Sequence, residues 1–456
     1  MTFNLNKQQE YIFINIINFK KHTLMKTMKL ISMCLAAIFM STITSCKSND
    51  EENNDGTVYK TRYMLKKPIQ FLNITEEQKE MIKNNRTFAF NLMRNVVDQE
   101  GVNNSTVISP MGVTYMLGMV NSGANATTQQ KIAEVLGFNG STTKQVNELC
   151  HGLLTQLPLI DPNIETETDN ALFVNDMKMK DEYADDMKNY YMADVKNVDF
   201  SSPDAVTAIN EWANKSTHGN IPTVVSSLDP TDGAYVLNNV YFKAEWTKQF
   251  DKEMTTTEQF TCEDGTKKNV QMMHCDALVD QTYNDTYRSL CLAYGGAQWY
   301  MYILLPREGK TLDDVINSLD SDAMEEMGKH NRDLRTDISI PKFEITQNTG
   351  LKDVMSKMGL DFLFDEHESG LSNISNSSPN VFLTNMFQSG NIDVNEEGTE
   401  YTAITIAIDK DAATAMPDGK LPEEELRVFN ANRSFVYIIT DNFYGIPYIV
   451  GTYTGK

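Results

Sequence analysis

The sequence predicts an α+β protein in which helices pack on a mixed set of β-strands. Apolar residues recur at helical spacing over 75–98 and 127–136, whereas buried-strand and hairpin patterns follow over 236–246 and 260–273. The chain has 456 residues, a length typical of two or three domains, but we find no internal repeat and no interdomain linker.

Charge excludes two classes of partner. The chain carries 40 basic and 62 acidic residues, a formal net charge of -22. Nucleic acids and anionic membrane surfaces are bound by basic surfaces. We therefore expect no nucleic-acid partner and an acidic, soluble surface.

The first 55 residues have the composition of an export signal and a tether. Lysines precede an apolar run, 30–40, and small residues then lead to Cys46, which is the order of a secretory signal. The run is too short to span a bilayer. Residues 43–46, Ile-Thr-Ser-Cys, resemble the lipobox of bacterial lipoproteins, whose cysteine is lipidated. We expect a leader over 1–45 and an acidic flexible tether over 46–66.

This leader predicts an exported protein, anchored by lipid at Cys46 to the outer-membrane surface of a Gram-negative bacterium. In the alternative interpretation the leader is an ordinary cleaved signal, and Cys46 has no special role. Residues 1–24 fit neither scheme, so translation is expected to start at Met25 or Met28.

The first helix of the domain is expected from Thr75 to Asp98. Residues 75–78, Thr-Glu-Glu-Gln, have the form of a capping box, and Gly101 is placed to stop the helix. Next, Ser109 and a proline lead into the apolar run 111–120. An amphipathic helix is then expected over 127–136, ended by a glycine.

Further segments continue this alternation. A turn signal at 263–266, Glu-Asp-Gly-Thr, predicts a hairpin within 260–273. The other segments combine apolar runs with recognisable turns: helix and turn residues over 208–222, a buried strand over 236–246, a strand over 341–345, and a helix followed by Leu-Phe over 351–364.

A long segment, 396–420, has loop composition near its end but strand alternation at its start. Thr399, Tyr401, Ala403 and Thr405 share one face at a period of two, and the residues between them share the other. Loops beyond roughly 12–15 residues are uncommon in compact domains unless they are functional or disordered. The segment is therefore interpreted as a loop that can become a strand.

Two motifs that flank this loop resemble segments of a known protein family. Residues 395–407 begin Asn-Glu-Glu-Gly-Thr-Glu, and residues 429–439 read Phe-Asn-Ala-Asn-Arg-Ser-Phe followed by an apolar strand. Together with the Ser-Pro, Leu-Gly-Phe and Phe-Lys-x-x-Trp segments upstream, they resemble the serpins, in order, over roughly 84–451. The resemblance implies a single serpin domain, 67–456, with helices packed around three β-sheets and an exposed reactive loop.

The resemblance also implies a function. Serpins are suicide-substrate inhibitors of serine endopeptidases, and some also of cysteine endopeptidases, that are cut in the loop and insert it into a sheet. It implies a monomer whose partner is the target endopeptidase, held as a covalent acyl complex, and it implies no cofactor. A non-inhibitory surface binding module with the same fold is the alternative function.

Site residues are transferred position by position. The hinge of the loop comprises Glu396, Glu397, Gly398, Thr399, Glu400, Tyr401, Thr402 and Ala403. The residues expected to hold the sheet ahead of insertion, called breach and shutter residues in the family, are Trp246, Ser109, Asn238 and Gln388. The reactive bond is expected at Ala412-Ala413, with Lys410, Met416 and Lys420 as alternatives.

Three positions depart from the family pattern. Tyr401 replaces a small residue of the hinge, Gly112 replaces a second serine after the Ser-Pro, and Gln388 replaces a histidine ahead of the hinge. An oversized inward side chain costs typically 1–3 kcal/mol, so Tyr401 is expected to slow insertion.

Residues typical of an enzyme or a metal site do not occur in characteristic patterns. No histidine beyond the leader belongs to HExxH, GxSxG or a Cys-His pairing, so each is interpreted as a surface or turn residue: His151, His218, His274, His330 and His367. The cysteines of the domain show no metal-ligand spacing, and their disulfide state is left open: Cys150, Cys262, Cys275 and Cys291. We expect neither a metal site nor catalysis.

Overall fold

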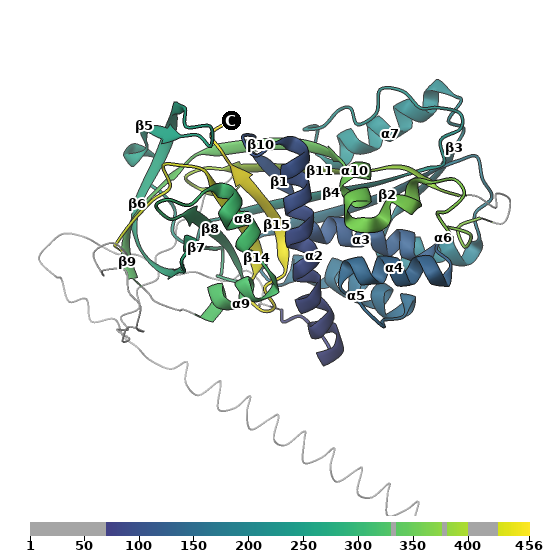
Figure 1. Cartoon of the computed structure of the whole chain (residues 1–456), viewed down its shortest axis with the longest axis horizontal. Coiled ribbons are helices and arrows are strands. Elements are labelled where there is room, and N and C mark those ends of the chain that lie inside the picture. Colours follow the sequence, from purple (N-terminus) through teal and green to yellow (C-terminus); the bar gives the residue numbers. More distant parts are fainter. Residues whose placement is uncertain (1–69, 330–333, 376–380, 400–426) are drawn as a thin grey trace, which may run out of the picture. The chain divides into compact units, whose positions relative to one another are not determined.

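Residues 70–329, 334–375, 381–399 and 427–456 are described by a computed structural model, shown in Figure 1. All of them fall within one structural unit, 61–456. Residues 400–426, where the reactive loop is expected, and residues 1–66, where the leader and tether are expected, lie outside the described residues. The division of the chain at residues 45 and 66 therefore stays a prediction.

A six-stranded sheet carries the hinge. Its strands follow the order β10, β11, β12, β4, β2, β3, and β12 is only two residues long. The bounds are β10 Phe343–Gly350, β11 Leu383–Val394, β12 Gly398–Thr399, β4 Ala234–Glu245, β2 Glu165–Asn175 and β3 Asp194–Val198.

The remaining strands form a nine-stranded sheet, in which β6 is 17 residues long. Near its start β6 pairs with β5 and β9, and at its end it pairs with β7, so it belongs to two sheet regions at once. The expected three sheets are thus present, with two of them joined through β6. The bounds are β1 Thr106–Ile108, β5 Thr256–Thr261, β6 Lys267–Tyr283, β7 Tyr287–Tyr294, β8 Trp299–Pro306, β9 Leu334–Pro341, β13 Val428–Asn430, β14 Phe435–Asp441 and β15 Pro447–Tyr453.

The helices begin and end where the sequence signals predict. Thr75 caps α2 through a complete capping box, and Gly101 ends that helix. Gly137 ends α4 in the left-handed conformation, with φ 78°. The helix bounds are α2 Glu76–Glu100, α3 Pro110–Ser122, α4 Ala126–Leu136, α5 Thr143–Gln156, α6 Asp181–Tyr191, α7 Pro203–Ser216, α8 Leu312–Ser318, α9 Ser321–Lys329 and α10 Lys352–Met355. Short helical turns are η1 Leu157–Leu159, η2 Lys252–Met254, η3 Ser356–Leu360 and η4 Asp361–Phe364.

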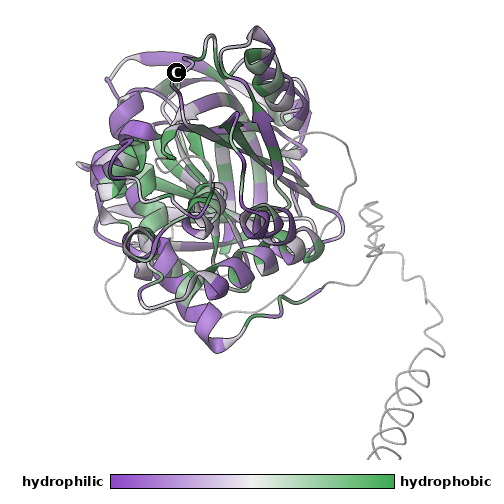
Figure 2. Ribbon diagram, turned by 90° about the vertical axis from the view of Figure 1, so that its right-hand side faces the viewer, coloured by the Kyte–Doolittle hydropathy of each residue, from purple (hydrophilic) through white to green (hydrophobic). Residues whose placement is uncertain are grey.

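Two apolar layers flank the six-stranded sheet. The main core includes almost the whole of α3, and it faces the residues of β4 with even numbers. A second, smaller apolar cluster lies on the other face, where α7 packs on Tyr235, Leu237 and Phe387. Figure 1 shows α7 on one side of β4 and β2 and α3 on the other, and Figure 2 shows apolar residues gathered between the layers. Within the described residues, no helix is long and apolar enough to cross a membrane.

Candidate functional site: a split sheet and its hinge

The hinge turns back on the end of β11. The backbone N–H of Asn395 donates to the carbonyl of Gly398 at 2.9 Å, and the N–H of Glu397 donates to Asn395 Oδ1 at 3.0 Å. The chain then runs antiparallel to both neighbouring strands, because Thr399 pairs with Val394 of β11 and Ala244 of β4. The first residues of the predicted latent strand are therefore already part of the sheet.

Glycine is required at position 398 by the approach of β4. A Cβ atom there would lie 2.1 Å from the carbonyl oxygen of Ala244 and 2.6 Å from the Cα of Glu245. Both of these are backbone atoms, so a side chain at Gly398 would separate the strands. The Gly-Thr order of the hinge thus follows from how tightly β12 fits.

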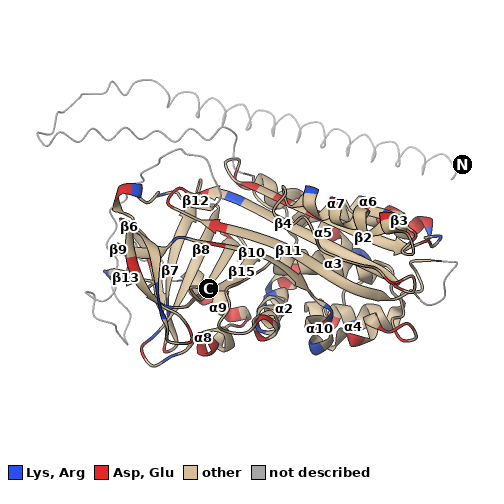
Figure 3. Cartoon of the chain, turned by 90° about the horizontal axis from the view of Figure 1, so that it is seen from above, with Lys and Arg blue, Asp and Glu red and all other residues tan. Residues whose placement is uncertain are grey.

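Two buried glutamates anchor the hinge by ion pairs. Glu396 receives Lys342 Nζ at 2.8 Å and the hydroxyl of Thr255 at 2.9 Å, and Glu397 pairs with Lys252. Figure 3 shows charged residues of both signs beside β12. Burial opposes ionisation of Glu396, but the hydrogen bonds from Lys342, from its own backbone and from Thr255 outweigh it and leave its pKa below the ordinary value.

Trp246, which follows β4 directly, holds the hinge in place by hydrogen bonds. Its backbone N–H donates to the carbonyl of Glu397 at 2.9 Å, and its indole Nε1 donates to the carbonyl of Asn395 at 2.9 Å. The ring stacks on Tyr294, with the centroids 4.3 Å apart and the planes 12° apart. The hydroxyl groups of Tyr294 and Thr399 lie 2.7 Å apart, so this aromatic pair also fixes Thr399, whose side chain is buried.

Three residues, Ser109, Asn238 and Gln388, form what we call the latch. Gln388 accepts the N–H of Ser109 at 2.7 Å and donates to its carbonyl at 2.8 Å and to Asn238 Oδ1 at 3.0 Å. Asn238 in turn donates to Asn170 Oδ1 on β2 at 2.9 Å. Since Ser109 also caps α3 through Gly112, the latch joins β11, β4 and β2 to the helix behind the sheet.

The residues at positions 112 and 388 fit each other. A Cβ atom on Gly112 would lie 2.0 Å from Asn238 Oδ1 and 2.3 Å from Gln388 Nε2. The space that a serine would fill at position 112 is therefore used by the two amides. The two departures from the family pattern, at positions 112 and 388, therefore compensate each other in volume.

The strands β11 and β4 separate at a point we call the fork. They pair in parallel from Leu383 and Ala234 as far as Gly390 and Val240. Four residues further on, at Val394 and Ala244, β12 lies between them. A small cavity of about 10 Å³ lies at the fork, lined in part by Val240, Gly390 and Asn391. The sheet is closed below the fork and open above it.

Comparisons with known proteins agree with this architecture. A family model described as "Serpin (serine protease inhibitor)" matches residues 83–455. The chain belongs to the serpin family. Serpins are generally protease inhibitors, although some members are not.

Relatives of this serpin come from distant organisms. An uncharacterized serpin-like protein of Thermococcus kodakarensis is 29% identical over 432 residues, covering 92% of this chain and 97% of the relative. Alpha-1-antitrypsin 1-5 of Mus musculus is 28% identical, covering 82% and 88%. The solved structure of thyroxine-binding globulin with thyroxine superposes with a TM-score of 0.72 at 24% identity, covering 82% of this chain and 99% of that one.

The structure of this serpin brings together the described half of the transferred site. Ser109, Asn238 and Gln388 contact one another, and Trp246 contacts the hinge, while the roles transferred to them stay predictions. The remaining site residues lie outside the described residues: Cys46, Glu400, Tyr401, Thr402, Ala403, Lys410, Ala412, Ala413, Met416 and Lys420.

Sequence reasoning missed the partners of the hinge. Lys342 and Tyr294 stand 54 and 105 positions before Glu396 and Thr399, and no local pattern marks them as contacts. Lys342 lies in a segment that was interpreted only as a strand. Its position directly after Pro341, at the end of β9, was the one signal that could have drawn attention to it.

His274 was interpreted as a surface or turn residue, and this was wrong. It lies within β6, with Nε2 2.7 Å from Glu258 and Nδ1 3.0 Å from the hydroxyl of Ser339. The set superficially resembles a Ser-His-Glu relay. However, Ser339 is nearly buried in a middle strand that pairs on both sides with β6 and β13, so a substrate carbonyl has no approach to it.

The cysteines of the domain are free thiols: Cys150, Cys262, Cys275 and Cys291. Burial raises the pKa of Cys150 and of Cys275 to about 12, so neither is a reactive thiolate at neutral pH. Within the described part of the chain, no group of histidine, cysteine and carboxylate side chains has the arrangement of a metal site.

Proposed function

We propose that this serpin is a suicide-substrate inhibitor of serine endopeptidases, with cysteine endopeptidases as a second class of target. Residues 400–426 act as the bait. The observation that carries the proposal is the position of β12, which already separates β11 from β4 above the fork while the same two strands pair below it. Residues that continue β12 as a strand would lie between the same two strands, β11 and β4.

The pairing of β12 defines the register of insertion. Thr399 lies opposite Ala244 and Val394, so each further residue of the loop moves one row down both strands. Ten further rows lead from Ala244 to Ala234, the first residue of β4, which at 3.4 Å a row is roughly 34 Å. Position 409 would then reach the end of β4, three residues before Ala412.

The fork divides these rows into two sets. Position 401 would lie opposite Phe242 and Ile392, in the part where β4 and β11 are not paired. Position 403 would lie opposite Val240 and Gly390, the first pair that must separate. Entry as far as Thr402 therefore breaks no strand pairing, and the barrier to insertion begins at Ala403.

Inward positions meet the main core. In this register the side chain of Tyr401 would stand between Phe242 and Ile392, both buried, which is the crowding expected from the sequence. Thr405 would come between Asn238 and Gln388, where its hydroxyl can replace the hydrogen bond that joins the two amides of the latch. Insertion would break the hydrogen bond between Gln388 and Asn238 and provide both amides with a new partner.

Outward positions meet the second apolar cluster. Ile406 would lie opposite Leu237 and Phe387, which belong to or pack against the cluster beneath α7. An isoleucine on the outer face of an ordinary surface strand would be exposed, whereas here it would add to a buried apolar layer. The register thus accounts for an apolar residue on the face opposite Thr405.

Inhibition would follow from the order of two events. The nucleophile of the protease attacks the carbonyl of the reactive residue, its acyl bond forms and the amine of the next residue leaves, as in ordinary proteolysis. The freed loop then enters the sheet with the protease still attached. The anchor at Glu396 and Glu397 fixes one end of the loop, so entry displaces the protease over the length of the sheet.

Target specificity rests on the sequence alone. Ala412-Ala413 is the proposed reactive bond, and its small side chains suit an elastase-like or subtilisin-like pocket. Lys410 and Lys420 would instead attract a trypsin-like enzyme through its acidic pocket, and Met416 is a further alternative. We also propose that Cys46 carries lipid and holds the monomer at the outer surface of a Gram-negative cell.

A non-inhibitory binding module is the second candidate, and Tyr401 is the observation that favours it. A bulky residue in the row of Phe242 and Ile392 can stop the loop before Ala403. Incubation of the mature protein with elastase, trypsin and subtilisin separates the two functions. An inhibitor gives a protease-sized, SDS-stable shift, whereas a non-inhibitory relative gives cleavage alone, and mass spectrometry then locates the cut.

A further inference from the structure

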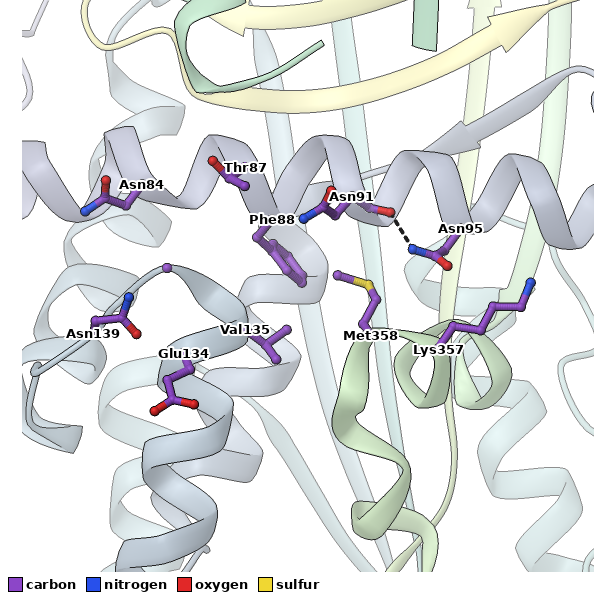
Figure 4. Close-up of a pocket in the computed structure, with 11 residues that line it drawn as sticks. Asn84, Thr87, Phe88, Asn91, Asn95, Glu134, Val135, Asn139, Lys357 and Met358 are labelled. Atoms are coloured by element: carbon purple, nitrogen blue, oxygen red, sulfur yellow. Dashed lines mark hydrogen bonds between the residues drawn. The ribbon is translucent and has the colours of Figure 1, made fainter. Parts of the chain in front are cut away.

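A groove remote from the hinge runs along α2. It has a volume of about 550 Å³, within the range of small-molecule sites. Its walls are α2, the end of α4 with the turn that follows, and η3. The residues drawn in Figure 4 line it.

One wall is a stripe of uncharged polar side chains. Asn84, Thr87, Asn91 and Asn95 are spaced by three or four residues, so they share one face of α2. The same helix carries many charged residues elsewhere, and the chain as a whole has a net charge of -22. An amide both donates and accepts hydrogen bonds, so the stripe suits a ligand rich in hydroxyl groups.

The amides have hydrogen-bonding capacity left for a ligand. Asn95 Nδ2 donates to the carbonyl of Asn91 at 2.8 Å, and Asn91 Oδ1 accepts from Arg94 at 2.7 Å. These contacts hold the two side chains in place while leaving Asn91 Nδ2 and Asn95 Oδ1 for other partners. Asn84 and Asn139 make no side-chain hydrogen bond to any other described residue.

The floor of the groove is apolar. In Figure 4, Phe88, Val135 and Met358 point toward one another between the polar residues. The turn with Asn139 closes one end, because Gly137 approaches α2 so closely that a Cβ atom would lie 2.7 Å from the carbonyl of Asn84. The partly exposed side chains of Val135 and Met358 offer apolar contact to the C–H groups of a sugar ring, and the amides around them can bond its hydroxyl groups.

The charge of the lining residues and the length of the groove limit the class of ligand that it can bind. Among the described residues that line the groove, the charged ones are Glu134, which accepts Gln130 Nε2 at 3.0 Å, and Lys357. Figure 4 draws these two residues at opposite ends of the groove, and a single lysine does not make an anion site. From Asn84 to Asn95 the helix rises roughly 16 Å, which is longer than a single sugar ring.

We propose that this groove binds a neutral oligosaccharide. The inference is independent of protease inhibition, since none of the lining residues belongs to the hinge, the latch or the fork. It gives the molecule a second binding surface, directed at glycans.

Titration calorimetry with defined hexasaccharides tests the proposal. The probes are the hexamers of α-1,4-glucose, β-1,4-glucose, β-1,4-xylose and β-1,4-N-acetylglucosamine, together with a sulfated hexamer and an extended acidic peptide. We expect at least one neutral hexamer to bind. Asn91→Ala with Asn95→Ala should weaken it about tenfold or more, because two hydrogen bonds are lost.

Asn103→Ala provides the matched control, since it removes an exposed amide outside the groove, and it should leave affinity unchanged. If the double variant is unstable, Thr87→Arg fills the groove from an exposed helix position and should abolish binding. Binding of no neutral hexamer overturns the proposal, as does binding that Thr87→Arg leaves intact. Binding of only the sulfated hexamer or the peptide also overturns it, whatever the protein does to proteases.

Discussion

The substitution Ala403→Arg tests the register of insertion most directly. In that register, position 403 lies opposite Val240 and Gly390 on the inward face. A Cβ atom on Gly390 would make ordinary van der Waals contact with Val107, at 3.4 Å, so this face of the row is lined by the core. After insertion a guanidinium there would be buried without a partner.

The expected magnitude is large. Leaving one buried charge unpaired costs about 3–5 kcal/mol. If the transition state for entry bears about 4 kcal/mol of this, insertion slows roughly a thousandfold, and deacylation should then win. The variant should become a substrate that is cut at the wild-type bond, at a similar rate, with little or no covalent complex.

Thr402→Arg is the matched control. It places the same side chain one residue earlier and on the outer face, opposite Tyr241 and Asn391, which are both half-exposed. Its complex yield on SDS gels should stay near that of the wild type. Thr399 is a poorer site for the test, because it is already buried against Tyr294 and an arginine there would disturb the uncut protein.

Wild-type complex yield from Ala403→Arg would refute the reasoning, since a strand that accepts a buried arginine in that row is not entering in the register of β12. Equal loss from both variants would also refute it, because the effect would then not depend on the face. Cleavage rate, measured together with complex yield, separates failed insertion from failed recognition.

Four other predictions follow from the same structure and leader. A single verified cut within 400–426 should raise the melting temperature, since the inserted strand adds ladder hydrogen bonds and buried area; an unchanged value contradicts insertion. Gly112→Ala should lower the free energy of unfolding, measured by denaturant titration, by about 1–3 kcal/mol. The loss should be smaller in a Gln388→Ala background, and additive losses would show that the two side chains do not compete for the same space. The pKa of Glu396 is lower in the folded protein than in the unfolded chain, so Glu396 stabilises the fold fully above its unfolded pKa, and this stabilisation is lost as pH falls through its folded pKa. The melting temperature should therefore fall less steeply at acid pH in Glu396→Gln than in the wild type. An unchanged acid dependence argues against this anchor. Fatty-acid labelling should mark the wild type and miss Cys46→Ala, whereas equal labelling of both would exclude the anchor.

Local signals predicted local structure well. The capping box at Thr75, the stop at Gly101 and the turn at 263–266 all lie where the sequence placed them, because each depends on side chains within a few residues of the feature. The strand face of Thr399 was also correct, since its period of two fixes which residues point inward once one of them is buried.

Long-range partners could not be predicted in the same way. The ion pair of Glu396 with Lys342 depends on where two distant strands end, and neither neighbourhood records the other. The same holds for the exchange of volume between Gly112 and Gln388, which are two separate departures from the family pattern in the sequence and one contact in the fold. The sharing of β6 between sheet regions likewise depends on its path in space.

The latch has a consequence for the chemical conditions in which the sheet stays shut. Its contacts are made by the side-chain amides of Asn238 and Gln388 and by the backbone N–H and carbonyl of Ser109, and none of these groups gains or loses a proton between mildly acidic and mildly alkaline pH. A histidine at position 388 would begin to charge near pH 6.5 and exchange an acceptor for a donor. With Gln388 in that place, the centre of the sheet keeps the same hydrogen bonds across the pH range in which a histidine would change its charge.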